Sequence, residues 1–379
     1  MLQCASRSSV KKRAPTKGWL LSALSCALLL LGCIKVVLAQ SESLPAPWRQ
    51  KVYPSAPQYL QFPRVGNGYL WFFRRSLRQP SIDAIQFHSF STDQVGQIPF
   101  WLEGASTVWI NDAAITSSLD VLVGGSYFSA DSNSSHNFLA IVDSAGNVRR
   151  TINVGRFEPE KVCSAQDGDI WTLGQDWQAE ATNTSYSMLR NYSSGGKLIH
   201  SYLPRKSLPL RKLNWSVREH ESGTLADFSK AFLECGTQSV GAYIAGVGTW
   251  IEIPLSDQKV QTWRIRRPSP TSTVTGLALL GTHQLYASFF SASRDSGNSQ
   301  HGLRGLYRVD LSEPSTSSWV LVPGSESRIT TRQGFAKLVG SDSSSLVYLP
   351  TSSNSADNAP LCCGPKYFQS NPALFWIKP

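Results

Sequence analysis

Residues 164–171 read SAQDGDIW, and this short stretch carries the pattern that decides the fold. Small and polar residues surround an Asp-Gly pair, and Ile170 and Trp171, which favour β-strands, follow it. An Asp-Gly or Asn-Gly pair supplies the positive φ that a tight hairpin turn requires. The stretch therefore predicts two antiparallel strands joined by a short turn, with apolar and aromatic residues on the second strand.

The same hairpin pattern recurs along the chain, as in a repeat protein. The clearest further copies are residues 64–71, 279–286 and 338–348, and weaker copies are 117–123 and 235–243. A gap and another apolar strand follow each copy, and in some units a further turn leads into one more strand. These following strands are expected at residues 84–90, 138–143, 187–192, 250–255, 305–311 and 373–377.

The repeats give six units of about 57 residues each, which predicts an all-β fold, a single six-bladed β-propeller of four-stranded blades. Seven or five blades are alternatives, and so is a sandwich or a pair of barrels. Tandem recurrence of one hairpin favours the propeller. One helix is expected as well, over residues 224–235 inside the fourth unit.

The two ends of the repeat region are expected to meet. The last unit ends with the strand 373–377 and lacks an outermost strand, whereas residues 49–53 precede the first unit and belong to no other. Because an unpaired strand edge is a liability, we expect these two segments to pair antiparallel and close the propeller. Phe375 and Ile377 would then face one side of the sheet and Trp376 the other.

Two of the hairpins resemble a known group of proteins. The sequences DGDIW at 167–171 and NGYLW at 67–71 are similar to the inner hairpins of six-bladed propellers of the NHL, gluconolactonase and streptogramin-lyase-like group. The resemblance implies the fold and not the chemistry. Lactonase members of the group hold a divalent cation with carboxylate and amide side chains, and no matching set is identified in this sequence.

The first 39 residues have the pattern of an export signal, a basic segment followed by an apolar run. Cleavage after Ala39, an uncleaved membrane anchor, and a lipoprotein with lipidated Cys33 are three alternatives. All three place the body outside the cytoplasm, either secreted or periplasmic. The expected organisation is a signal peptide or anchor at 1–39, a linker at 40–48 and the β-propeller at 49–379, so the only membrane contact expected is through that anchor.

The net charge of +10 does not indicate a nucleic-acid-binding protein. Six of the 36 basic residues and none of the 26 acidic residues lie in the export segment, so the remainder carries only +4. This is an ordinary surface charge, and no nucleic-acid partner is expected.

Four of the seven cysteines lie beyond the export segment: Cys163, Cys235, Cys362 and Cys363. An even number outside the cytoplasm is compatible with one or two structural disulfides, and buried free thiols are the alternative. Their pairing cannot be read from the spacing. No CxxC pair is present and the six histidines are scattered, so no metal-binding residues are predicted.

The sequence contains none of the common catalytic motifs. The candidate binding residues come from two places. One is a pair of glutamates before the first strand of the third unit, and the other is the densest group of ionisable residues in the chain. In chain order they are Glu158, Glu160, Arg218, Glu219, His220 and Glu221. Polar loops are the plainer interpretation of both. We therefore expect a non-enzymatic propeller that binds a small molecule, a glycan or a protein, without a cofactor. The alternative is a hydrolase or lyase that acts on a sugar, lactone or glycan with a divalent metal in the central funnel.

Overall fold

The structure is a computed structural model, and the residues that it describes are 49–52, 61–116, 118–132, 134–207, 231–269, 272–281, 284–291, 305–312, 316–325, 336–342, 344–350 and 373–378. The chain separates into two compact units, Met1–Ser43 and Leu44–Pro379. Every described residue belongs to the second unit, so the predicted export segment and linker lie outside the described residues. Within the described part, no helix is long and apolar enough to cross a membrane.

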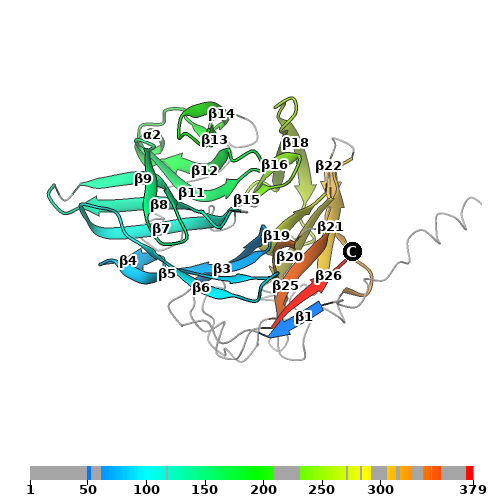
Figure 1. The fold of residues 1–379 in the computed structure, drawn as a ribbon. Helices are drawn as coiled ribbons and strands as arrows, with labels where there is room; N and C mark the ends of the chain where they lie inside the picture. The colour runs from blue at the N-terminus through cyan, green and yellow to red at the C-terminus, as the bar shows by residue number, and fades with distance from the viewer. Residues whose placement is uncertain are drawn as a thin grey trace, which may run out of the picture. The chain divides into compact units, whose positions relative to one another are not determined.

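The hairpin at 164–171 forms as the sequence predicts. It joins β11 (Phe157–Ser164) to β12 (Ile170–Asp176), and Gly168 in the turn has a φ of 87°. β13 (Ser187–Tyr192) and β14 (Leu198–Pro204) continue the sheet in chain order, with each strand antiparallel to the one before. The result is a four-stranded meander, visible in green in Figure 1.

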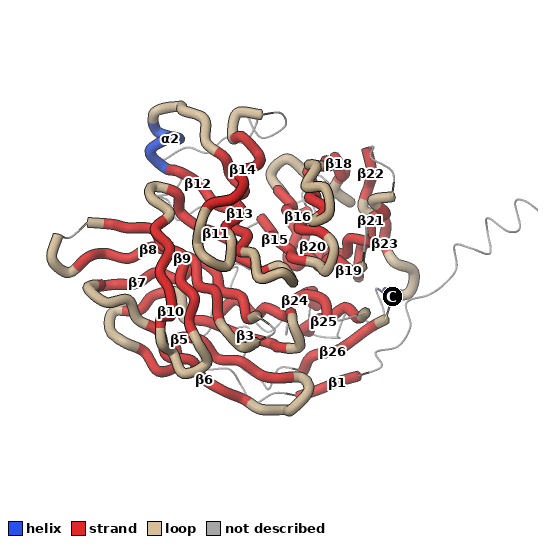
Figure 2. Tube along the Cα trace, turned by 45° about the horizontal axis from the view of Figure 1, so that its top comes forward, coloured by secondary structure: helices blue, strands red, loops and turns tan. Residues whose placement is uncertain are grey.

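The other described strands repeat this meander, and Figures 1 and 2 show the sheets following one another around the molecule. The first strand of each meander runs beside the first strands of its neighbours. This arrangement of repeated antiparallel sheets is that of a β-propeller. The strands, meander by meander, are β2 (Gln61–Gly66), β3 (Tyr69–Phe73), β5 (Ser81–Ser89) and β6 (Val95–Phe100); β7 (Ala105–Ile115), β8 (Val121–Ser129), β9 (Ser135–Val142) and β10 (Val148–Asn153); β11 to β14; β15 (Ala231–Cys235), β16 (Ser239–Ile244), β17 (Thr249–Pro254) and β18 (Gln261–Arg266); β19 (Ser272–Leu280), β20 (Gln284–Ser291), β21 (Leu306–Asp310) and β23 (Val320–Leu321); and β24 (Ala336–Asp342), β25 (Ser345–Pro350), β26 (Ala373–Ile377) and β1 (Arg49–Val52).

We call β2, β7, β11, β15, β19 and β24 the first strands. Each contacts the first strand of the next meander, and β24 pairs in parallel with β2 through Val65 and Gly340. The approach is close enough to require glycine. A Cβ on Gly276 of β19 would lie 1.8 Å from the carbonyl oxygen of Leu338 in β24.

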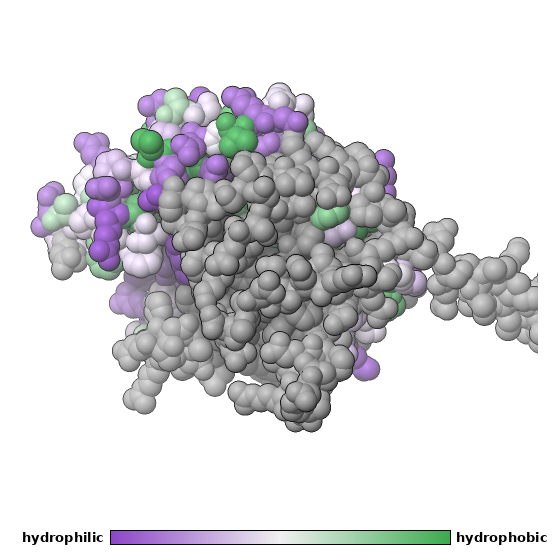
Figure 3. Space-filling model, turned by 90° about the horizontal axis from the view of Figure 1, so that it is seen from below, coloured by the Kyte–Doolittle hydropathy of each residue, from purple (hydrophilic) through white to green (hydrophobic). Residues whose placement is uncertain are grey.

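The strands β12 and β16, which lie directly behind first strands, are buried on both faces because neighbouring sheets cover them. All side chains of β12 and β16 are buried, and the core contains several fully buried tryptophans. Hydrophilic and hydrophobic residues alternate over short distances on the coloured part of the surface in Figure 3. Burial of the sheets against one another, at about 25 cal/mol per Å² of apolar surface, stabilises the fold.

Three details differ from the expected plan. The helix expected over 224–235 is wrong for residues 231–235, which form β15, because this segment pairs along its whole length with β16. A helix that the sequence did not suggest, α2 (Trp177–Ala181), follows β12. Two short strands join neighbouring sheets: β4 (Ser76–Leu77) pairs with β7, and β22 (Thr316–Ser318) pairs in parallel with β18.

The two ends of the repeat region pair as expected. β1 runs antiparallel to β26, with Arg49 opposite Trp376 and Val52 opposite Ala373. The two faces of β26 also separate as predicted: Trp376 packs with Leu70, Phe72 and Phe90 in one core cluster, and Ile377 and Phe375 pack in another. The first and last meanders therefore share a hydrophobic core.

One disulfide is present among the described cysteines, between Cys163 of β11 and Cys235 of β15. It connects the first strands of two neighbouring meanders across a sequence separation of 72 residues. The expectation of a structural bridge is confirmed for this pair, whereas Cys362 and Cys363 lie outside the described residues.

We expect Trp376→Ala to destabilise the whole domain by about 3–5 kcal/mol, the usual cost of removing a large buried aromatic side chain. Trp376 is fully buried, its ring meets that of Phe90 edge-on at 5.0 Å, and its Nε1 donates to Asp342 Oδ2 at 3.1 Å. Urea unfolding measures the change. Trp376→Phe keeps most of the packing and should lose much less, and equal stability of Trp376→Ala and wild type would contradict the shared core.

Replacing both cysteines, Cys163→Ala with Cys235→Ala, should lower the free energy of unfolding by about 4 kcal/mol, because the bridge closes a long loop in the unfolded chain. Denaturant unfolding under non-reducing conditions measures this loss. The single Cys163→Ala variant should lose a similar amount, since either change removes the bond. Unchanged unfolding midpoints in both variants would show that the bridge does not contribute.

Candidate functional site

The structure describes two of the six candidate binding residues. Glu158 and Glu160 lie within β11 itself, not in a loop before it as the sequence suggested, because the strand starts at Phe157. The remaining candidates, Arg218, Glu219, His220 and Glu221, lie outside the described residues, so their role stays a prediction.

The carboxylate of Glu158 is held by two side chains from different elements. The Nδ2 of Asn111 in β7 donates to Oε1 at 3.1 Å, and the Nε1 of Trp177 in α2 donates to Oε2. Asn111 also donates to the carbonyl oxygen of Pro159 at 3.1 Å. Both oxygens of Glu158 are therefore engaged, and β7 and β11 are tied together at this point.

Glu160 is buried and sits at an irregularity of β11, where the pairing register with β12 shifts between Pro159 and Lys161. The Nε2 of Gln175 donates to its Oε1 at 3.1 Å. Burial, together with the negative charge of Glu158, raises the pKa of Glu160 to about 7, although the positive charges of Lys161 and Arg75 act in the opposite direction. The Oε1 of Gln175 is buried and accepts no hydrogen bond, so an acceptor without a partner lies beside this carboxyl group.

Asp112 connects three first strands. It belongs to β7, its Oδ2 accepts the backbone N–H of Val162 in β11 at 3.0 Å, and the Nη2 of Arg64 in β2 lies 3.5 Å from the same oxygen. The side chain of Asp112 is only 3% exposed and that of Arg64 is 19% exposed. A carboxylate this deeply buried requires such partners, because desolvation otherwise makes its charge very costly.

Two further ionisable groups lie on neighbouring first strands. Burial lowers the pKa of Lys161 in β11, whereas the negative charge of Asp112 acts to raise it. Burial raises the pKa of Glu234 in β15 to about 7, although Arg64 acts in the opposite direction. The Cys163–Cys235 disulfide joins the same two strands, since Cys235 directly follows Glu234.

We call this group the first-strand cluster. Its members come from four consecutive first strands and the residues beside them, and their charges act on one another. The cluster consists of Arg64, Arg75, Asp112, Glu158, Glu160, Lys161, Gln175 and Glu234.

Sequence reasoning found only two of these residues. The signal that could have found more is a charged residue inside an otherwise apolar first strand, such as Asp112 in the sequence WINDAAI at 109–115. Superposing the repeats would have aligned such positions, because first strands lie side by side in a propeller.

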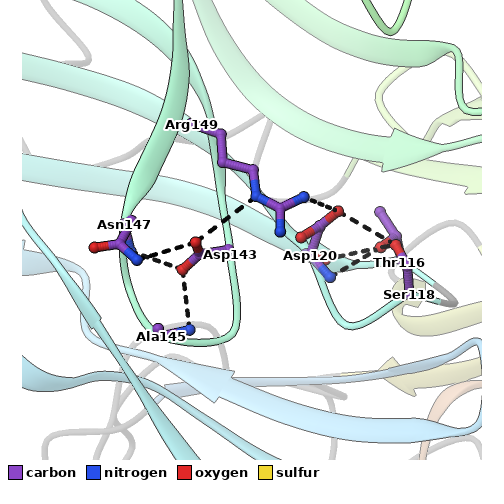
Figure 4. A network of polar contacts seen from close by, with 7 residues as sticks. All are labelled: Thr116, Ser118, Asp120, Asp143, Ala145, Asn147 and Arg149. Carbon is purple, nitrogen blue, oxygen red and sulfur yellow. Dashed lines mark hydrogen bonds and ion pairs between the residues drawn. The ribbon is translucent and has the colours of Figure 1, made fainter.

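A second polar network lies on the turns of the second meander (Figure 4). Arg149 reaches Asp120 at 3.3 Å and Asp143 at 3.7 Å, and Asp143 also accepts the backbone N–H groups of Ala145 and Asn147. The side-chain and backbone hydrogen bonds from Asn147 lower the pKa of Asp143. Every contact in this network stays within the second meander, between β10 and the turns beside it, so its role is structural.

Among the described residues, no group of three or more His, Cys, Asp or Glu side chains is arranged to hold a metal ion.

The raised pKa of Glu160 predicts a pH-dependent stability. The folded-state pKa of about 7 exceeds the unfolded value of 4.5, so the folded protein retains a proton that the unfolded chain has lost between these pH values. The contribution of Glu160 to the free energy of unfolding is fully present below pH 4.5 and is lost as the pH rises through 7. The loss amounts to about 3 kcal/mol at most.

Glu160→Gln should therefore reduce the fall in unfolding free energy between pH 4.5 and 7, and Glu234 should account for the part that remains. Denaturant unfolding at several pH values measures this slope. Exposed Glu103→Gln is the matched control and should keep the wild-type slope. An unchanged slope in Glu160→Gln would show that Glu160 ionises normally.

No family model matches this chain, and no curated protein sequence is similar to it. Among solved structures, streptogramin B lyase aligns with a TM-score of 0.42 and 11% identity over 79% of this chain and 80% of that chain. Hydrazine synthase of Kuenenia stuttgartiensis aligns with a TM-score of 0.42 and 11% identity over 80% and 74%. The PQQ-bound aldose sugar dehydrogenase of Streptomyces coelicolor aligns with a TM-score of 0.43 and 9% identity over 89% and 99%. A streptogramin lyase, the group that the two hairpins resemble, is thus among the similar structures, and a likeness at this identity says nothing about reaction or ligand.

Proposed function

We propose that the mature chain is a single six-bladed β-propeller of four-stranded blades, closed by the β1–β26 pair. The succession of first-strand contacts supports this, because it runs from β2 through β7, β11, β15 and β19 to β24 and returns to β2. The shared core around Trp376 supports the same closure. A seven-bladed ring would need another first strand in the part of the chain outside the described residues.

We further propose that the protein acts outside the cytoplasm by binding and not by catalysis, with the first-strand cluster as its site for a small polar ligand. One observation carries this proposal. Charged donors and acceptors from four first strands converge, and beside them the buried Oε1 of Gln175 has no hydrogen-bond partner. A ligand that donates a hydrogen bond would satisfy this acceptor and offset its desolvation.

The hydrogen bonds favour binding over catalysis. Both oxygens of Glu158 and one oxygen of Asp112 accept hydrogen bonds from fixed protein groups. Carboxylates held in this way are rigid and already stabilised, which suits recognition better than attack on a substrate. The Cys163–Cys235 disulfide supports a location in an oxidising compartment.

The second candidate function is a hydrolase or lyase that acts on a sugar, lactone or glycan with a divalent metal. The raised pKa of Glu160 favours it, since a carboxyl group that titrates near neutral pH beside a second carboxylate can serve as a general acid or base.

Thermal shift experiments test the binding proposal with four probe sets at pH 7: amines, amino acids, hydroxy acids and monosaccharides. A ligand that binds only the folded protein raises the melting temperature as its concentration exceeds the Kd. We expect one set to raise the melting temperature of wild type and of exposed Glu103→Gln, but not of Gln175→Leu or Glu160→Gln.

Equal shifts in wild type and both cluster variants, or no shift with any probe, would contradict the cluster as a ligand site. Turnover of a lactone or glycoside that Glu160→Gln abolishes would instead support the enzyme. Removal of divalent metal with a chelator separates the two functions further, because only the metal-dependent enzyme should lose its activity.

A further inference from the structure

Exposed aromatic side chains gather at one place on the described surface. Trp109 of β7 is 40% exposed and Phe128 of β8 is 39% exposed. Every other Trp and Phe whose side-chain burial the structure describes is buried or half-buried. Large exposed rings cost free energy in water, so their concentration in one place points to a function.

The strand register places both rings on the same face of the second meander. Trp109 pairs with Ser126, and Phe128 lies two residues beyond Ser126 opposite Thr107. Paired residues of antiparallel strands share a face, and diagonal neighbours are within reach of aromatic side chains. Trp109 and Phe128 are therefore one diagonal step apart on a common surface.

Uncharged hydrogen-bonding side chains surround the two rings. The row through Trp109 continues across the sheet to Ser76 of β4 on one side and to Ser126 and Asn137 on the other. None of these three polar residues is buried, and none of them is charged. We call the surface formed by Ser76, Thr107, Trp109, Ser126, Phe128 and Asn137 the aromatic face.

The aromatic face is accessible because this sheet extends beyond its neighbours. The hairpin of β8 and β9 projects from the remaining strands at the left of Figures 1 and 2. On the opposite side of the same strands, Val108 and Phe138 are buried in the core. The sheet thus buries one side and leaves the aromatic face exposed.

We propose that the aromatic face binds a neutral oligosaccharide. A sugar ring presents apolar C–H groups on its faces and hydroxyl groups around its rim. Aromatic rings pack against the C–H groups of the sugar. Serine, threonine and asparagine side chains bind its hydroxyl groups, since they both donate and accept hydrogen bonds. The six side chains of the aromatic face carry no charge, so they themselves provide no ion-pair partner for the phosphates of a nucleic acid or for an acidic glycan.

Two rings one diagonal step apart contact more than one sugar unit, so the ligand is a chain and not a monosaccharide. This site is distinct from the first-strand cluster, although Asn111, two residues after Trp109, donates to Glu158 of that cluster.

Isothermal titration with five soluble probes tests the proposal: cellohexaose, xylohexaose, maltohexaose, laminarihexaose and chitohexaose. We expect at least one to bind wild type and to change the tryptophan emission. Trp109→Ala and Phe128→Ala should each weaken the Kd by about tenfold, as removal of an aromatic anchor does, and the double variant should not bind measurably. Trp109→Tyr keeps a ring and should bind within about threefold of wild type.

Ile82→Ala is the matched control, because Ile82 is 76% exposed and lies on a different sheet. Melting temperatures should be equal in all variants, since each substituted side chain is substantially exposed. Absence of binding to all five probes, or equal binding by wild type and the double variant, would overturn the proposal. Self-association of wild type that the double variant loses would also overturn it, because the face would then be an interface between copies.

Glu160→Gln separates this proposal from the first-strand cluster. Oligosaccharide binding should be unchanged in Glu160→Gln. If Glu160→Gln abolishes binding and the aromatic variants do not, the first-strand cluster binds the sugar and the aromatic face does not.

Discussion

The carboxylate of Asp112 is the interaction on which the centre of this molecule depends. It is part of β7, it accepts a backbone N–H from β11, and it pairs with Arg64 of β2. Since the side chain is almost completely buried, its charge is tolerated only while these partners remain in place. The positions of three first strands and the state of one buried charge are thus coupled, so a displacement of any of these strands would leave the carboxylate poorly compensated.

Burial is the main cause of the raised pKa values of the neighbouring carboxyl groups. Glu160 and Glu234 lie close to charges already fixed by the fold, and their own burial makes ionisation unfavourable near neutral pH. A hydrophobic first strand would avoid this cost entirely. Retention of several ionisable residues where apolar ones would pack well is the kind of local conflict that proteins show at functional sites. The Cys163–Cys235 bond lies on the two strands that carry Lys161 and Glu234, so a covalent link joins two of the strands that form the cluster.

The sequence predicted the elements governed by local chemistry. Turn residues such as Gly168 and alternating apolar residues located the hairpins, and the predicted strands 187–192 and 373–377 agree with β13 and β26 residue for residue. A helix was the expectation over residues 224–235, but pairing with β16 prevails for residues 231–235. The cluster was mostly missed because its contacts join residues far apart, such as Asp112 and Val162, which are 50 positions apart. No single repeat contains both partners, so only the superposition of repeats could have brought them together.

The two candidate sites differ in which groups they present and in how exposed those groups are. This difference favours a different kind of ligand at each site. In the first-strand cluster, polar groups are buried or half-buried and largely satisfied by one another, which limits it to ligands small enough to replace a missing partner such as the one Gln175 lacks. On the aromatic face, apolar groups are exposed and unsatisfied, which suits a ligand that arrives from solvent and remains partly in it. Asn111 lies between them: its strand carries Trp109, and its amide holds Glu158. A chain bound on the aromatic face would therefore lie two residues along β7 from a side chain that positions the cluster, while the two sites bind separate ligands.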